Sequence, residues 1–430
     1  MGSRVRVAAV ALWLAALGLG AGAGLARAQG PDAAPAQAPR EPAQQPAPGT
    51  QADVFDILRR LFKDPPSTPP DQEPAADRSF QLSIMPGFGY NPSAGFIIGA
   101  SGTLSNYFGD PATTRISSAV IGMSYSSKQQ ASLTMKFGAS GSGNRWRLDG
   151  DNRFQWTSQD SYGLGTGTSP ADRVYTRFTF VRVTDGLWYE LTKNLYAGAG
   201  FHYSLHTNVR PGDEGDPAWE DSDYVVYSQQ NGFNLEGQTS AGFSLGLMLD
   251  TRDNPINASR GWFAAVGYRP SLKDLFGADA ALQESFVDVR SFVSVTKDRR
   301  HRLAAWVHGD FVGSGTAPYF DVPALGVSIL GRSGRGYTEG RFRGDQLLYG
   351  ELEYRATLTR NGLLGMVAFV NTTTLANRET GEQLFDAFAS AGGVGLRVLF
   401  SKRTSTNLCI DYAWGRQGAR GFYLGLQEAF

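Results

Sequence analysis

The feature that most constrains the fold is a period of two, which runs from Phe80 to the end of the chain. In the stretch Leu195 to Leu205, one set of alternate residues is Leu, Ala, Ala, Phe, Tyr and Leu, and the other is Tyr, Gly, Gly, His and Ser. Residues 145–156 and 347–358 alternate in the same way, with charged residues on one face and apolar residues on the other. Successive side chains of a β-strand point to opposite faces, so these stretches predict amphipathic strands.

The predicted strands are long, and their length bears on their surroundings. Strands of globular proteins usually have about 5 to 6 residues, whereas a tilted strand needs about 9 to 11 residues to cross a bilayer. Aromatic residues gather near the strand ends, as in the interfacial girdle of an outer-membrane barrel. A soluble β-sandwich also alternates, but its outward face is polar. Because strands can span lipid only when every backbone group is paired, the pattern predicts an all-β, closed, antiparallel transmembrane β-barrel.

We predict sixteen strands, and the lengths of their connections support that number. They begin near residues 82, 95, 115, 131, 145, 174, 195, 237, 261, 281, 302, 346, 363, 388, 405 and 420. With this count the long connections, 158–173, 209–236, 316–345 and 375–387, all fall on the same side. Outer-membrane barrels have short periplasmic turns and longer external loops, so the long connections are predicted to be external.

The residues before the barrel have a different character. Residues 1–28 predict a signal peptide, because two arginines precede an apolar stretch that ends in the small-residue site Ala26–Ala28; an uncleaved anchor is the alternative. Residues 29–79 predict a Pro-rich periplasmic linker, with a short amphipathic helix over 52–63 that docks on the barrel or binds a membrane surface or partner. The barrel itself is predicted over 80–430. These features indicate a bacterial cell envelope, and specifically the outer membrane.

Composition excludes several other classes. Lys plus Arg and Asp plus Glu both number 40, so the basic excess of a nucleic-acid binder is absent. After the signal, the sequence has no apolar run long enough for a membrane helix. Cys409 is the only cysteine, so no intramolecular disulfide can form.

The strand over 346–359 carries Glu351, Glu353 and Arg355 on one face. A charge at mid-depth on the lipid face would cost roughly 2 to 4 kcal/mol, so these residues are predicted to face the lumen. The loop before this strand, 316–345, is predicted to be the sixth external loop. Its glycines let it fold inward, so that Arg335 pairs with one of the lumenal carboxylates.

The stretch from Gly334 to Arg355 resembles the BamA/TamA-type outer-membrane assembly-factor family, also called the bacterial surface antigen family. The resemblance implies that Arg335, Gly336 and Tyr337 form the inward loop tip, with Glu353 and Arg355 as lumenal partners. In the next strand Phe369 matches the family pattern, but Asn371 stands where the family has Asp, which leaves Glu353 and Glu351 as the ionic partners. No room for POTRA domains precedes the barrel, so the chain resembles the POTRA-less branch.

The last strand suggests how the barrel reaches the membrane. It carries a terminal signature that the resemblance implies is a sorting signal for the barrel assembly machinery: Phe422, Leu424, Leu426 and Phe430. Phe430 is expected to close this strand. Outer-membrane lipid and lipopolysaccharide are the other expected partners.

The sequence is compatible with three functions. The first is membrane assembly, or translocation of protein or lipid, through a weak seam between the first and last strands near Gly87, Gly89 and Gly425. The second is a passive or gated channel. The third, an enzyme, is disfavoured, because the four histidines lie in no nucleophile or metal-ligand pattern. We expect no cofactor and no metal, and the sequence names no client.

Overall fold

The computed structural model describes residues 51–54, 56–57, 81–110, 114, 117–213, 215–254, 257–327, 333–402, 405–426 and 428–430. The predicted signal peptide (1–28) and most of the predicted linker (29–79) lie outside these residues. Among the described residues, no helix is both long and apolar enough to cross a membrane.

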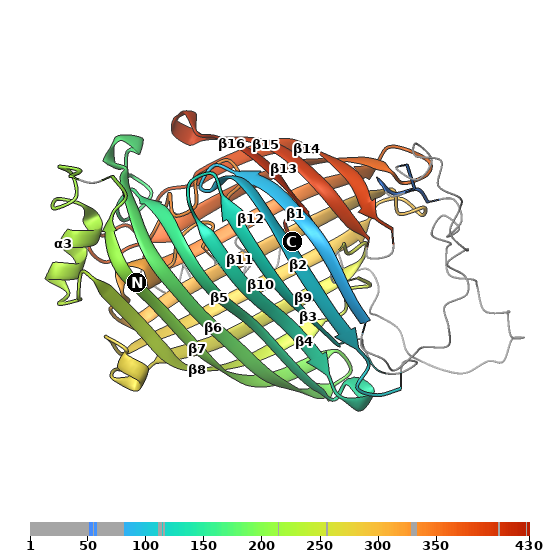
Figure 1. Cartoon of the computed structure of the whole chain (residues 1–430), viewed down its shortest axis with the longest axis horizontal. Coiled ribbons are helices and arrows are strands. Elements are labelled where there is room, and N and C mark those ends of the chain that lie inside the picture. Colours follow the sequence, from blue (N-terminus) through green and yellow to red (C-terminus); the bar gives the residue numbers. More distant parts are fainter. Residues whose placement is uncertain are drawn as a thin grey trace, which may run out of the picture. The chain divides into compact units, whose positions relative to one another are not determined.

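Sixteen antiparallel strands form one closed barrel, in which each strand pairs with its neighbours in sequence and β1 meets β16 (Figure 1). The strands are β1 (Gln81–Asn91), β2 (Gly95–Asn106), β3 (Ser117–Ser126), β4 (Ala131–Ser140), β5 (Trp146–Ser161), β6 (Val174–Thr192), β7 (Leu195–Pro211), β8 (Gly237–Asp250), β9 (Gly261–Ser271), β10 (Leu282–Ser294), β11 (His301–Gly315), β12 (Gln346–Thr357), β13 (Leu364–Ala376), β14 (Ala389–Ser401), β15 (Thr406–Gly415) and β16 (Arg420–Leu426). The predicted fold class and strand count are confirmed.

The two faces of the wall differ as the alternation predicts. On β5, Trp146, Leu148 and Trp156 are exposed on the outer face, while Asp151 on the inner face is 9% exposed. On β12, Leu352 is 49% exposed, whereas its neighbour Glu353 is fully buried. The outer face therefore suits hydrocarbon, and the ionic groups lie in the lumen.

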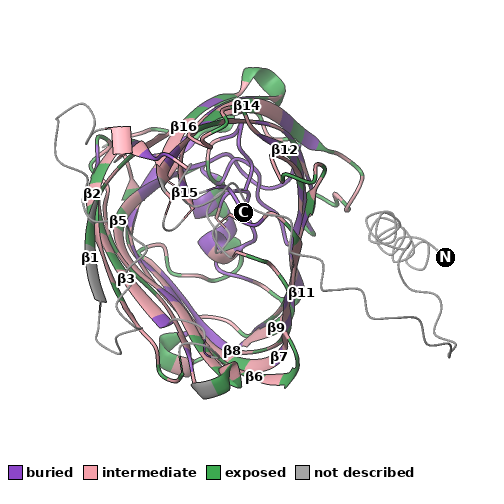
Figure 2. Cartoon of the chain, turned by 90° about the vertical axis from the view of Figure 1, so that its right-hand side faces the viewer, coloured by how far each residue is buried: buried purple, intermediate pink, exposed green. Residues whose placement is uncertain are grey.

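Buried segments cross the inside of the ring of strands, and the C-terminus lies there as well (Figure 2). The largest such segment is the connection between β11 and β12, which contains the 3-10 helix η4 (Tyr319–Asp321). We call the described parts of this connection, 316–327 and 333–345, the lumenal loop.

A cluster of aromatic residues lies at the end of the barrel that carries the long connections. The helix α3 (Asp223–Gln230) lies between β7 and β8, and the Ser222 hydroxyl caps it by accepting from the Val225 amide. Tyr224 of α3 packs on Tyr319 and Phe320 of η4, with ring centroids 5.6 and 5.2 Å apart. This packing joins the lumenal loop to the connection between β7 and β8.

At the opposite end, residues just ahead of the barrel contact two short turns. The Ala52 amide donates to the Asn361 carbonyl over 3.1 Å. Asp53 and Asp56 each accept from the other's backbone amide, an arrangement that caps a helix start, and Asp56 pairs with Lys402 at 2.9 Å. Of the helix predicted over 52–63, only this beginning lies within the described residues.

Candidate functional site: the loop tip and the seam

Arg335, at the tip of the lumenal loop, lies among three carboxylates. Its Nη1 donates to Asp411 Oδ2 of β15 over 2.7 Å, and its Nη2 donates to Glu351 and Glu353 of β12. The guanidinium carbon lies 3.6 Å from the centre of the Phe369 ring on β13. Arg335 is 5% exposed, so the loop tip joins three strands through one buried cation.

The charge of Arg335 is held by these neighbours. Burial lowers the pKa of its guanidinium, but the carboxylates of Glu351, Glu353 and Asp411 outweigh burial and raise the pKa well above its ordinary value. Removal of one member of such a cluster leaves an uncompensated buried charge. The cluster therefore fixes the loop only when it is complete.

Gly336 and Tyr337 extend the attachment to β14, β15 and β16. The Gly336 amide donates to the Tyr423 hydroxyl of β16 over 2.9 Å, and that hydroxyl donates to the Tyr337 carbonyl over 3.0 Å. The Tyr337 hydroxyl donates to the Ser390 carbonyl of β14 over 2.6 Å. Gly336 has φ +110°, and a Cβ there would lie 2.7 Å from Ala391 Cβ, so the position requires glycine.

The structure corrects the expected partners of Arg335. The sequence predicted that Arg335 pairs with a carboxylate of β12, with Glu353 and Glu351 as candidates; both contribute, and Asp411 of β15 is a third partner that was not predicted. Asn371 has a different role from the acid that the family pattern places there, since its Nδ2 donates to the Arg335 carbonyl over 3.0 Å. Asp411 carries a signal that could have identified it: it alternates with Ile410 and Tyr412, and a charge between lipid-facing residues must point inward.

The end of the chain also differs from the prediction. The last strand stops at Leu426, and Phe430 does not close it but is buried in the lumen, 5.3 Å from the Trp306 ring. The Phe430 carbonyl accepts from Arg355 over 3.1 Å, and Glu428 accepts from Arg397 over 2.7 Å. Two lumenal arginines thus hold the terminal residues inside the barrel. The sorting role of Phe422, Leu424, Leu426 and Phe430 stays a prediction.

A second attachment of the lumenal loop lies on another part of the wall. Asp321 accepts from the Ser204 hydroxyl of β7 over 2.7 Å and from the Ser240 hydroxyl of β8 over 2.6 Å. Arg343, 2% exposed, donates to the carbonyls of Tyr319 and Val322 within the loop. Asp321 was not predicted, because it lies in a loop, where no alternation reveals the direction of a side chain.

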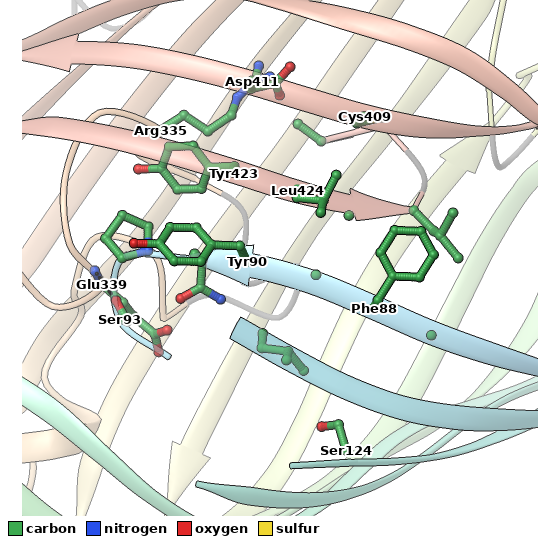
Figure 3. Close-up of a pocket in the computed structure, with 18 of the residues that line it drawn as sticks. Phe88, Tyr90, Ser93, Ser124, Arg335, Glu339, Cys409, Asp411, Tyr423 and Leu424 are labelled. Carbon is green, nitrogen blue, oxygen red and sulfur yellow. Dashed lines mark hydrogen bonds and ion pairs between the residues drawn. The ribbon is translucent and has the colours of Figure 1, made fainter. Parts of the chain in front are cut away.

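The closure between β1 and β16 is much weaker than the other strand pairings. Among the described residues, one register pair, Tyr90 opposite Leu424, joins the two strands, and the Tyr90 ring lies 5.6 Å from the Phe422 ring. A cavity of about 440 Å³, which we call the seam cavity, lies beside this closure (Figure 3). Its lining includes β1 from Gly87 to Asn91, β16 from Tyr423 to Leu426, and Asp411 from the lumenal face of β15.

Residues 98–430 match the Omp85 superfamily domain. The chain belongs to the Omp85 superfamily. This membership confirms the predicted family and the predicted location in the bacterial outer membrane. No curated protein matches this Omp85 chain by sequence.

Solved structures share the fold of this Omp85 barrel. BamA from Haemophilus ducreyi lacking POTRA domains 1–3 is similar with a TM-score of 0.55 and 12% identity, over 81% of this chain and 71% of that one. CdiB from Acinetobacter baumannii is similar with a TM-score of 0.50 and 12% identity, over 81% of this chain and 66% of that one. CdiB from Escherichia coli gives 0.51 and 10%, over 80% and 63% respectively. The chain thus spans slightly less than two thirds of either CdiB protein.

Proposed function

We propose that this Omp85 barrel opens between β1 and β16 to move protein or lipid into or across the outer membrane. The single register pair at this closure carries the proposal, because each other neighbouring pair is joined by a longer ladder. Among the described residues, β16 offers β1 no register partner from Gln81 to Gly89, so this edge of β1 can pair with another strand. Membership of a family of outer-membrane assembly and transport barrels supports the same function.

The loop tip indicates which side of the opening stays fixed. Arg335, Gly336 and Tyr337 bind β12 to β16, so those strands form one unit with the lumenal loop. The last strand has only seven residues, and Leu426 is followed by residues that lie in the lumen. We infer that β1 and its neighbours move away from this unit when the seam opens.

A reversible lock tests the opening. Tyr90→Cys and Leu424→Cys, made together with Cys409→Ser, place two thiols on directly opposed residues, at a separation that suits a disulfide. The double-cysteine variant replaces the wild-type protein in the native host. The levels of outer-membrane proteins and the lipid asymmetry of the outer membrane are then measured. Oxidation should impair one of the two, and a reductant should restore it.

The matched control puts the same pair elsewhere in the wall. Leu348 and Thr374 are opposed on β12 and β13, within a continuous ladder. A disulfide at that position should leave both measurements unchanged. If the locked seam supports the same levels as the reduced one, the barrel does not work by opening there.

A gated channel is the second candidate, supported by lumenal cavities of about 420 and 320 Å³ that contain charged side chains. The attached loop and the aromatic cluster argue against a continuously open pore. We expect little steady conductance in a planar bilayer, and an increase in Arg335→Ala. A large steady conductance of the wild type would favour the channel.

The prediction that the protein is not an enzyme stays a prediction, and the structure places two of its histidines beside polar partners. His202 lies 3.0 Å from the Ser271 hydroxyl, and His308 lies 2.8 Å from Asp310. Within the part of the chain that the structure describes, no cluster of His, Cys, Asp and Glu could hold a metal ion. Contacts with lipopolysaccharide and insertion by the barrel assembly machinery stay predictions.

A further inference from the structure

Two cavities of different chemistry meet behind the seam. The seam cavity is lined mainly by apolar groups, among them Phe88, Met123, Leu424 and Leu426. The second, of about 420 Å³, lies farther inside and is lined largely by hydroxyl and amide side chains; we call it the polar cavity. The two cavities share these lining residues: Asn91, Ser93, Ile97, Ser124, Gly326 and Glu339. The two cavities therefore adjoin each other, and each has the size of a small-molecule site, about 300 to 1,000 Å³.

The polar cavity contains an arginine without a partner. Arg182 of β6 lines it and makes no hydrogen bond or ion pair with any described residue, although its guanidinium lies 5.0 Å from the Phe180 ring. Most other lumenal arginines are paired, as Arg335 and Arg397 show. A guanidinium that pairs with no described carboxylate is suited to bind an anion.

Further cations line the same cavity. Lys136 and Arg153 both pair with the single carboxylate of Asp151, at 3.2 and 2.7 Å. With Arg182, these residues give the cavity three cations against two carboxylates, those of Asp151 and Glu339. The excess positive charge favours a phosphate over a neutral or cationic group.

Glu339 lines both cavities, and Figure 3 shows it in the seam cavity, near Ser93. Its amide donates to the Ser93 hydroxyl over 3.0 Å, but its carboxylate makes no ion pair with a described residue. Burial raises the pKa of Glu339, and the more distant charges of Arg153, Arg182 and Arg343 only partly offset that effect. The junction therefore holds an acid that a ligand can displace without breaking an existing ion pair.

We propose that the two cavities form one binding site for an amphiphile that carries a phosphate. Its phosphate binds Arg182, Arg153 and Lys136 in the polar cavity, and its acyl chains pass through the seam cavity to the lipid. This inference rests on the proposed function, because it makes a membrane lipid the substrate class admitted at the seam. A polypeptide strand would pair with the edge of β1, but would leave Arg182 unpaired.

The test uses the full-length protein, freed of lipid in a phosphate-free maltoside detergent. It is titrated by calorimetry with dioctanoyl phosphatidic acid, with dioctanoylglycerol and with glycerol 3-phosphate. The proposal expects the complete amphiphile to bind at least tenfold more tightly than either of its halves. Arg182→Gln should weaken that binding by about tenfold or more, as expected for a charge-assisted hydrogen bond.

Two further variants keep the result interpretable. Arg177→Gln is the matched control, because Arg177 lies on the same strand but lines neither cavity, and its affinity should equal that of the wild type. Ser124→Trp should block the junction without touching Arg182 and should also weaken binding. Heat-modifiability on a gel shows whether each variant is folded. If Arg182→Gln does not fold, Ser124→Trp alone tests the proposal.

Phospholipid and the lipid A part of lipopolysaccharide share the required chemistry. Competition of phosphatidylethanolamine and monophosphoryl lipid A against dioctanoyl phosphatidic acid shows which source binds more tightly. Equal affinity for phosphatidic acid and dioctanoylglycerol would overturn the proposal, as would unchanged affinity in both Arg182→Gln and Ser124→Trp.

The seam itself can be tested apart from the lipid. If a peptide copying residues 420–426 binds and phosphatidic acid does not, the lipid site is wrong while the proposed opening stands. If phosphatidic acid binds but the Tyr90–Leu424 lock has no effect in cells, the opening is wrong while the site remains.

Discussion

The wall from β12 to β15 and the closure between β1 and β16 are built in opposite ways. Strands β12 and β13 pair without interruption from Gln346–Ala376 to Thr357–Gly365, and the Arg335 cluster ties them to β15. At the closure, Tyr90 and Leu424 are the one pair in register within the described parts of β1 and β16. The Arg335 cluster thus lies on one side of the weakest joint and has no counterpart on the β1 side among the described residues.

This difference between the two regions explains how the seam can be weak while the barrel stays closed. The loop tip binds strands β12 to β16, whereas the hydrogen bond from Glu339 to Ser93 is the one that the described part of the loop makes with the β1–β2 hairpin. Opening the seam therefore breaks few contacts on the β1 side. The last strand keeps its attachment to the loop through Tyr423.

The largest expected effect on stability comes from removing Arg335, the cation at the centre of the buried cluster. Arg335→Ala leaves Glu351, Glu353 and Asp411 without their shared cation, and we expect a loss of about 3 to 5 kcal/mol in the free energy of unfolding. Urea titration in lipid vesicles measures the loss, and the heat resistance of the folded band on a gel reports it as well. Arg177→Ala, outside the cluster, should leave both unchanged. Equal stability of Arg335→Ala and wild type would show that the cluster does not hold the wall.

A slightly smaller effect is expected from the end of the chain. Phe430→Ala empties a buried position against Trp306 and Phe292, which should cost about 3 kcal/mol in the free energy of unfolding. Phe422→Ala is the comparison, because Phe422 is 40% exposed on the outer face. It should change the same urea midpoint much less. The reverse order would place the stabilising contact at the seam rather than in the lumen.

The seam can be perturbed directly with one methyl group. A Cβ at Gly89 would lie 2.8 Å from the Leu424 carbonyl oxygen, so Gly89→Ala should push β1 and β16 apart at a cost of about 1 to 3 kcal/mol. Hydrogen exchange should then rise on β1 and β16 but not on β12. Gly102→Ala on β2 is the control, because its Cβ meets nothing within 4 Å. Unchanged exchange on β1 would mean that the closure is not limited by this contact.

The smallest effect concerns the segment ahead of the barrel. Lys402→Ala removes the ion pair with Asp56, which is worth about 0 to 1 kcal/mol at a partly exposed site. Protease cleavage between residues 57 and 81 should become faster, while the urea midpoint of the barrel should not change. Lys193→Ala, in another turn at the same end, should leave cleavage unchanged. A change in the barrel's own midpoint would show that this contact supports the wall.

The sequence alone predicted most of the barrel, because alternation and connection length are local properties. All sixteen strands begin within two residues of the predicted starts, with β3 at Ser117 against a predicted 115 showing the largest difference. The lumenal direction of Glu351, Glu353 and Arg355 followed from the cost of placing charge in lipid. The family pattern also predicted Arg335 at the tip of the inward loop, but it did not give all of its partners.

Only the tertiary structure decided which lumenal charges meet. Asp411 is 76 residues from Arg335, and no local pattern shows that loop and strand come together inside a closed ring. Phe430 appeared to continue the alternation of the last strand, but two buried arginines on other strands draw the chain end into the lumen. Strand direction depends on neighbouring residues, whereas charge pairing depends on barrel closure, which brings distant strands around one enclosed interior.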